Sequence, residues 1–510
     1  MRIYHAEQPT HEVAAAPERT RHRRPRGRRA DAAVAAVAAG LVAAGLTWAT
    51  WDGAFDHVPL LDRAVAGGFE VVGCALLLAA LSSPERRWIT RTLPILLLSV
   101  TGLVALVALT LWITGTVTDA YPPSFAIWVG AGFAALAGCP LVLRRRPVDR
   151  ATRPADGRTT GRTTGGTAGR ALAWRKAAAV VAVPATIAGA FMQIDQQYGI
   201  WPQLGDVLGH SGAISGQQAH DLIGGAATPG SDPPAHGVIV SLDAPASRSH
   251  FSHRPGVVFL PPAYFGPGRP TLPVLIMLVG SPGTPINWLR SGHGQSTDDA
   301  YAAAHNGRAP VLVVVDQNGS ATGDTECIDG PRGNAETYLT VDVPAFITGT
   351  LRIQHNPSRW GIAGFSEGGT CALDLVLGHP DIYRHVIDFG GDARPNLGDP
   401  AHTLSTLFGG SLAAERAHDP AWLLSTRRYP GVTLWFGAGA GDARDIAVGE
   451  QLAAAAVRDG IVTHRFVDPG GHNWQFASAG FAGVLPQLCD EMVTGGLASR
   501  LVQPLVQRPR

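Results

Sequence analysis

Long apolar stretches dominate the first 195 residues of the chain and restrict what this part can fold into. A helix needs about 20 apolar residues to cross the roughly 30 Å hydrocarbon core of a membrane. One such stretch after an Arg-rich start would be typical of a signal peptide, but several in succession are not. The sequence therefore predicts an all-α transmembrane region of about five helices over residues 31–195, with apolar stretches near 32–51, 64–82, 91–115, 124–143 and 177–194.

The loops between these stretches differ in positive charge. Arginine is concentrated before the first stretch, between the second and third (Arg86, Arg87, Arg91), and between the fourth and fifth. The other two loops carry almost none. Under the positive-inside rule, this alternation predicts a cytoplasmic N-terminus and an extracytoplasmic location for everything after about residue 195. We expect residues 1–30 to form a disordered tail and residues 147–176 a flexible linker, both cytoplasmic.

Charged residues inside the apolar stretches are few. Glu70 lies in the second stretch, where we expect it near a helix end or facing a neighbouring helix. An acid within a membrane can mark a functional site, but no pattern of paired charges suggests transport. The membrane region is therefore expected to act as an anchor.

The remaining residues resemble an ordinary soluble domain in composition. Residues 196–236 are expected to form a tether, residues 237–495 a folded domain and residues 496–510 a C-terminal tail. Several runs in this domain are apolar throughout and alternate with helical patterns, which predicts an α/β fold: a mostly parallel sheet with helices on both faces. We expect strands near 237–241, 256–260, 272–279, 309–315, 359–365, 385–389, 432–436 and 463–467, and helices near 297–306, 337–351, 370–378 and 447–459.

One of these strands runs directly into a helix through the sequence Gly364-Phe-Ser366-Glu-Gly368. A turn this tight strains the backbone of the serine and leaves no room for side chains two residues before and after it. Such a turn would raise the serine hydroxyl above the carboxyl edge of the sheet, where ligands of α/β sheets bind. Ser366 is therefore a candidate nucleophile.

Partners for this serine follow two later strands. His472 comes after the run 463–467 and a Pro-Gly-Gly turn, and Asp442 comes after the run 432–436 and a Gly/Ala turn. A serine hydroxyl needs a base to take its proton, and a carboxylate orients and stabilises that base. We expect His472 as the base and Asp442 as the acid, with Asp445 as the alternative acid; capping a helix is the competing role for either aspartate.

Two backbone N–H groups are needed to stabilise the oxyanion that forms when a nucleophile attacks a carbonyl group. One is expected from Glu367, directly after the candidate nucleophile. The other is expected in the loop that begins at Gly280, where Ser281 is the predicted donor because Pro282 has no N–H. The competing interpretation of this loop is an ordinary Gly- and Pro-rich turn.

Charge and cysteine content exclude other classes of function. The formal net charge is +1 and no folded segment carries a basic stripe, so nucleic acid is not an expected partner. The five cysteines form no C-x-x-C pair, and we expect neither a metal nor another cofactor. Cys327 and Cys371 lie in the domain expected outside the cytoplasm, where a disulfide can persist; whether they form one stays open.

These motifs resemble the esterase D-like branch of the α/β-hydrolases, which also contains the antigen 85 mycolyltransferases. The resemblance rests on the residues around Ser366, on Gly439-Ala-Gly-Asp442, on Gly470-Gly-His472-Asn-Trp474 and on the segment 324–333, and it covers about residues 250–490. It implies an α/β-hydrolase fold, a Ser366–Asp442–His472 triad and Ser281 and Glu367 as oxyanion donors. The loop at Val279-Gly280 departs from the His-Gly of many such esterases, and mycolate specificity is not implied.

The sequence thus leads us to expect a membrane-anchored, extracytoplasmic serine esterase or acyltransferase that forms an acyl-enzyme. Water or another hydroxyl group would resolve that intermediate, and the motifs do not distinguish the two. The predicted anchor favours an ester of a cell-envelope lipid or an acylated glycan as substrate. One alternative is a non-catalytic envelope protein that keeps the fold for binding. A channel or transporter with an appended domain is another, but it would need polar residues lining the spans.

Overall fold

A computed structural model of the chain describes residues 55–83, 85–113, 123–144, 164–208, 210, 212–224, 234–266, 270–351, 353 and 355–494. Its N-terminal part contains four helices long and apolar enough to cross a membrane, at residues 63–81, 88–110, 124–143 and 171–198. They correspond to the second to fifth predicted stretches. The first predicted stretch, the two predicted tails and most of the predicted linker lie outside the described residues.

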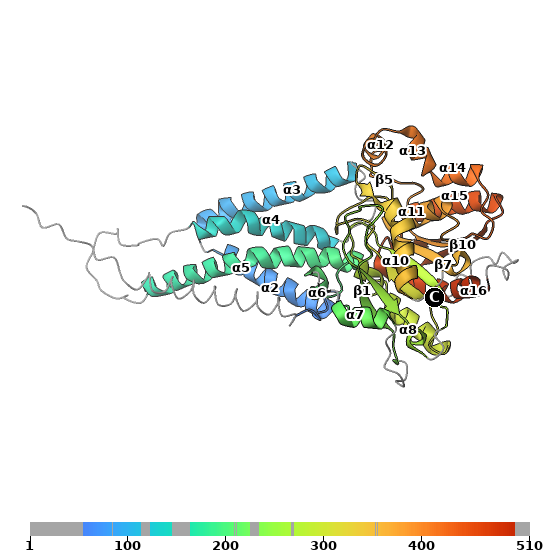
Figure 1. Ribbon diagram of the computed structural model, residues 1–510. Helices are drawn as coiled ribbons and strands as arrows, with labels where there is room; N and C mark the ends of the chain where they lie inside the picture. The colour runs from blue at the N-terminus through green and yellow to red at the C-terminus, as the bar shows by residue number, and fades with distance from the viewer. Residues whose placement is uncertain are drawn as a thin grey trace, which may run out of the picture. The chain divides into compact units, whose positions relative to one another are not determined.

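The four apolar segments belong to α2 (Arg63–Leu81), η1 (Trp88–Thr92) with α3 (Leu93–Ile113), α4 (Pro123–Leu143) and α5 (Thr164–Tyr198). They are coloured blue to green in Figure 1. Because α5 begins at Thr164, residues 164–176 are helical, although the sequence suggested that they belong to a flexible linker. Small side chains at Ala80, Ala135, Ala179 and Ala182 are fully buried where α2, α4 and α5 pack together. Glu70 faces a neighbouring helix, as expected, because its carboxylate accepts a hydrogen bond from Gln193 of α5.

The second half of the chain is built on an eight-stranded sheet in the order β1-β2-β4-β3-β7-β8-β9-β10. β2 runs antiparallel to both of its neighbours, and the pairs from β4 to β10 are parallel. This is the mostly parallel α/β-hydrolase sheet that the sequence predicted. The strands are β1 (Val238–Leu242), β2 (Gly256–Leu260), β3 (Val274–Leu278), β4 (Val311–Val314), β7 (Trp360–Phe365), β8 (His385–Phe389), β9 (Thr433–Gly439) and β10 (Val462–Asp468).

Helices cover both faces of this sheet. One face packs against α7 (Gly216–Ile223), α10 (Val343–Thr350), α11 (Glu367–Gly378), α14 (Pro420–Thr426) and α15 (Ala443–Arg458). The other packs against η3 (Pro285–Trp288) and α16 (Trp474–Thr494), and α8 (Gly294–Ala304) packs on α16. The strands β2, β3, β4, β7 and β8 between these layers are buried along their whole length, and the first four of them are apolar throughout.

Several elements were not expected from the sequence. They are the helices α12 (Pro400–Phe408), α13 (Leu412–Ala417), α14 and α16, the two-stranded sheet of β5 (Asp329–Gly330) and β6 (Gly333–Asn334), and short helices such as η2 (Pro262–Phe265), α9 (Ala335–Thr337) and η5 (Pro357–Arg359). The predicted helix near 337–351 corresponds to η4 (Tyr338–Asp342) and α10. The predicted tether contains α6 (Leu204–Val207) and α7, and Ala219 and Ile223 of α7 are buried in the core of the sheet domain.

The register of the parallel strands brings their carboxyl ends together. Leu278 at the end of β3 lies opposite Gly364 of β7, and Phe365 of β7 lies opposite Phe389 of β8. Gly439 at the end of β9 lies opposite Asp468 of β10. The loops that follow these strands therefore meet at one edge of the sheet.

Candidate active site

The turn between β7 and α11 holds Ser366 in a strained backbone conformation. Its φ is 60° and its ψ is −126°, which is a region that residues with side chains rarely adopt. The neighbouring glycines explain why the turn can form. A Cβ on Gly364 would collide with the backbone of Gly368, and a Cβ on Gly368 would lie 2.5 Å from the carbonyl oxygen of Val279. This is the tight strand-to-helix turn that the sequence predicted around Ser366.

His472 lies beside this serine. Its Nε2 atom is 2.8 Å from Oγ of Ser366, although 106 residues separate the two along the chain. The loop between β10 and α16 carries the histidine, and the ring packs against Phe365 with their centroids 5.1 Å apart. The imidazole side chain is 26% exposed, so the pair is accessible from solvent.

The acid that contacts His472 is Asp445. Its Oδ2 atom lies 2.7 Å from Nδ1 of His472, whereas Oδ2 of Asp442 lies 3.7 Å away. Asp442 instead caps α15, since its carboxylate accepts hydrogen bonds of 3.0 Å from the backbone N–H groups of Arg444 and Asp445. The geometry therefore favours the aspartate that the sequence analysis placed second. Burial raises the pKa of Asp445, while its hydrogen bond to His472 acts in the opposite direction.

The loop after β3 packs against the turn at Ser366. A Cβ on Gly280 would lie 2.9 Å from Cβ of Ser366. Ser281 is the next residue in this loop, and Glu367 is the first residue of α11. The two predicted oxyanion donors thus belong to backbone segments that flank the serine on two sides.

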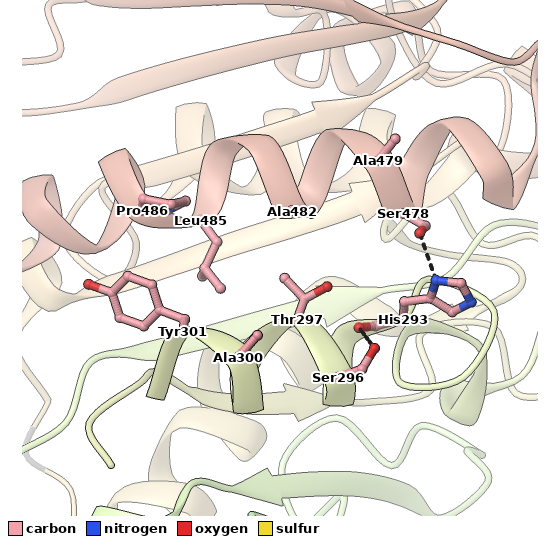
Figure 2. Close-up of a pocket in the computed structure, with 10 residues that line it drawn as sticks. All are labelled: His293, Ser296, Thr297, Ala300, Tyr301, Ser478, Ala479, Ala482, Leu485 and Pro486. Carbon is pink, nitrogen blue, oxygen red and sulfur yellow. Dashed lines mark hydrogen bonds between the residues drawn. The ribbon is translucent and has the colours of Figure 1, made fainter. Parts of the chain in front are cut away.

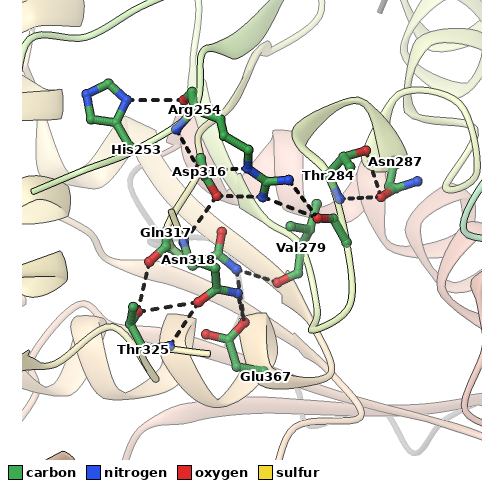
Figure 3. A network of polar contacts seen from close by, with 11 residues as sticks. His253, Arg254, Val279, Thr284, Asn287, Asp316, Gln317, Asn318, Thr325 and Glu367 are labelled. Carbon is green, nitrogen blue, oxygen red and sulfur yellow. Dashed lines mark hydrogen bonds and ion pairs between the residues drawn. The ribbon is translucent and has the colours of Figure 1, made fainter. Parts of the chain in front are cut away.

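A buried polar network, drawn in Figure 3, connects these two segments. The carboxyl group of Glu367 accepts hydrogen bonds of 3.0 Å from the side-chain amides of Gln317 and Asn318. Beside them, Arg254 forms a bidentate ion pair with the fully buried Asp316, at 2.8 and 2.9 Å, and donates to the carbonyl oxygen of Gly283. Burial, followed by the nearby charge of Asp324, raises the pKa of Glu367 to about 8.

The sequence analysis did not single out Arg254, Asp316, Gln317 or Asn318. A signal for three of them was present, because Asp316-Gln317-Asn318 directly follows a predicted strand at the ligand-binding edge of the sheet. Arg254 had no comparable signal, since it lies before a strand and far from the motifs in sequence.

Cys327 and Cys371 form a disulfide, with their Cα atoms 5.4 Å apart. The bridge connects the loop after β4 to α11, which begins directly after Ser366. The same place contains one of two groups of potential metal ligands among the described residues, Cys327, Glu367 and Cys371, but disulfide sulfurs are not thiolates and do not ligate a metal. The other group is Asp442, Asp445 and His472, in which both nitrogens of the imidazole ring already face protein groups.

A separate hollow of about 410 Å³ lies between α8 and α16 (Figure 2). Its wall includes Tyr301, Leu485 and a hydrogen-bonded pair, Ser478 and His293, whose Oγ and Nδ1 atoms are 3.1 Å apart. Ser366, Asp445 and His472 do not line this hollow, so it is distinct from the serine site.

The second half of the chain is similar to proteins of one described family. Residues 248–485 match the family described as "Putative esterase". An uncharacterized protein of Corynebacterium glutamicum is 35% identical over 235 residues, which cover 45% of this chain and 55% of that protein. An S-formylglutathione hydrolase of Paracoccus denitrificans is 28% identical over 157 residues, 30% of this chain and 56% of that enzyme. The chain thus spans about half the length of the curated relatives it matches.

Among solved structures, MPT51 of Mycobacterium tuberculosis is similar with a TM-score of 0.32 and 17% identity, covering 47% of this chain and 94% of that one.

Proposed function

We propose that the protein is a serine esterase or acyltransferase in which Ser366 is the nucleophile, because residues 248–485 match the family described as "Putative esterase". The observation that carries the proposal is the contact of His472 with both partners. Its Nε2 atom lies 2.8 Å from Oγ of Ser366, and its Nδ1 atom lies 2.7 Å from Oδ2 of Asp445. The strained turn at Ser366 adds support, since strained backbone conformations cluster at functional sites.

The geometry suggests the order of proton transfers. His472 Nε2 takes the proton of the Ser366 hydroxyl as Oγ attacks the ester carbonyl carbon, and Asp445 stabilises the imidazolium ion that results. The oxygen of the carbonyl becomes negative and is stabilised by the backbone N–H groups of Ser281 and Glu367. His472 then returns the proton to the departing alcohol, which leaves an acyl group on Ser366.

The second half of the reaction mirrors the first. A water molecule or an acceptor hydroxyl group gives a proton to His472 and attacks the acyl carbon, and Ser366 recovers its proton when the acyl group leaves. Water as acceptor makes the protein an esterase, and an alcohol or sugar hydroxyl makes it an acyltransferase. The family description and the S-formylglutathione hydrolase among the relatives favour hydrolysis.

We further propose that the reaction takes place outside the cytoplasmic membrane. Three observations support this: the apolar helices α2 to α5, the concentration of arginine in every second loop of the apolar region, and the Cys327–Cys371 disulfide. Disulfides persist mainly in oxidising compartments. A domain anchored at the membrane surface would meet esters of envelope lipids or acylated glycans, and we propose these as the substrate class.

The function is tested by hydrolysis assays on the full chain purified in detergent. We expect wild type to hydrolyse p-nitrophenyl esters and Ser366→Ala to be inactive while unfolding at the same temperature. Esters of increasing acyl length then show whether the site accepts lipid-like chains. The wild type could instead be well folded, hydrolyse none of these esters and transfer no acyl group to glycerol or trehalose. That result would favour the alternative function, a binding protein that keeps the fold.

A further inference from the structure

Gln317 occupies a fully buried position just after β4, between the two backbone segments that flank Ser366. Its Nε2 atom donates one hydrogen bond of 2.5 Å to the carbonyl oxygen of Val279 and another of 3.0 Å to Oε2 of Glu367 (Figure 3). Val279 immediately precedes Gly280-Ser281, and Glu367 immediately follows Ser366. A single amide nitrogen therefore contacts both backbone segments of the predicted oxyanion hole. We call these segments its two arms: the loop after β3, which contains Ser281, and the start of α11 at Glu367.

An oxyanion hole stabilises the transition state only when its two N–H groups point at the same oxygen atom. The two arms here come from different elements, the loop after β3 and the first turn of α11, which are far apart in sequence. We propose that Gln317 is a positioning residue that keeps these two arms aligned, with the carboxyl group of Glu367 as its second anchor. This inference rests on the proposed esterase activity.

The chemistry of the side chain explains why glutamine suits this role. A primary amide has two N–H donors on one nitrogen, and both are used here. An ionised glutamate in the same place would have none and would face the carbonyl oxygen of Val279 with a second acceptor. Asn318 provides a matched comparison, because its Nδ2 also donates to Oε2 of Glu367 at 3.0 Å, while its Oδ1 accepts from the backbone of Thr325. Among the described residues, Asn318 thus supports only one of the two arms.

The charge state of Glu367 offers a second way to observe how this side chain is linked to the oxyanion hole. The acids that face its carboxyl group are Asp316, Asp324 and Glu326; Arg254 pairs with Asp316, and Arg332 lies near Asp324. Burial is the main reason that the pKa of Glu367 is raised to about 8. The carboxyl group is therefore uncharged at neutral pH. As the pH rises through about 8, a negative charge develops beside the oxyanion hole and repels the negative oxygen of the transition state.

The first test compares Gln317→Glu with Asn318→Asp in the full chain in detergent, with p-nitrophenyl acetate at pH 7.5. Each substitution replaces an NH2 group by an oxygen and adds one carboxyl group. We expect Gln317→Glu to lower kcat at least about tenfold with little change in KM, because misaligned donors reduce only the stabilisation of the transition state. We expect Asn318→Asp to lower kcat less than about threefold. Equal losses in the two variants, or a loss confined to KM, would overturn the proposal.

The second test keeps the proposal falsifiable if Gln317→Glu does not fold. Glu367→Gln preserves an acceptor for Gln317 but cannot ionise. We expect the ratio of kcat/KM at pH 9 to that at pH 7 to rise at least about threefold over the wild-type ratio, since the repulsion is removed. An unchanged ratio would contradict a link between Glu367 and the oxyanion hole even in an active enzyme. A folded wild type without any esterase or acyltransferase activity would overturn the proposed function and this inference together.

Discussion

Oδ2 of Asp445 lies 2.7 Å from Nδ1 of His472, which makes Asp445, and not Asp442, the acid in contact with the imidazole ring. The reason is the way in which α15 begins. Asp442 uses its carboxylate to accept from two backbone N–H groups in the first turn of the helix. The residue three positions later lies on the same side of the helix and reaches the histidine.

Substitution of the two aspartates by asparagine distinguishes their roles. Asn cannot hold His472 in the required tautomer and charge state, so we expect Asp445→Asn to lower kcat by about 10³- to 10⁴-fold. Asn is a good helix cap, so Asp442→Asn should lower kcat less than about tenfold and change stability by less than about 1 kcal/mol. Steady-state kinetics of both variants provide the measurement, and a larger loss of activity in Asp442→Asn would reverse the assignment.

The disulfide between Cys327 and Cys371 is expected to stabilise the domain. It closes a segment with a sequence separation of 44 residues. The loss of chain entropy in the unfolded state corresponds to about 4 kcal/mol for a loop of this length. We expect a reducing agent to lower the unfolding temperature of wild type in detergent. A Cys327→Ala/Cys371→Ala double variant should unfold at a lower temperature with or without the reductant. An unfolding temperature of wild type that does not respond to full reduction would contradict this.

The raised pKa of Glu367 also makes a prediction for stability. The pKa increases from 4.5 to about 8 on folding, so between these values the native state holds a proton that the unfolded state has released. The free energy of unfolding therefore falls as the pH rises through this window. Glu367→Gln lacks this dependence, and its unfolding temperature relative to wild type should increase from pH 5 to pH 8 and then level off. A difference that stays constant over this range would contradict the shift.

The proposed membrane topology predicts the location of the C-terminus. Alkaline phosphatase folds only outside the cytoplasm, because it needs disulfides, so a fusion after the last residue should be enzymatically active in bacterial cells. Green fluorescent protein fused at the same position should be dark after export by the general secretion route. Bright fluorescence together with an inactive phosphatase would place the domain in the cytoplasm. That outcome would also remove the argument for envelope substrates.

Much of the fold could be predicted because its signals are local. The buried strands β2, β3, β4 and β7 are apolar throughout, and the turn at Ser366 needs glycines at fixed positions, so both can be recognised within a few residues. The sequence analysis did not predict the helices α12, α14 and α16, because each contains a proline, which usually interrupts a helix. Pro486 lies inside α16, against the usual preference, while Asp399-Pro400 and Asp419-Pro420 are helix starts that could have been recognised by their caps.

Two parts of the site could not be predicted for physical reasons. The choice between Asp442 and Asp445 depends on how the first turn of α15 is oriented, and counting residues after the strand does not provide this. The contact of Gln317 with both Val279 and Glu367 joins three segments that are distant in sequence. Only their shared position at the carboxyl edge of the sheet brings them together.

The central claim is that Ser366 is an activated nucleophile, and labelling with a fluorophosphonate probe followed by mass spectrometry tests it most directly. The full chain in detergent should gain one adduct, located on the peptide that contains Ser366, and Ser366→Ala should gain none. Asp445→Asn should react more slowly than wild type. A folded wild-type protein that gains no adduct, or gains one on another residue that persists in Ser366→Ala, would contradict the account.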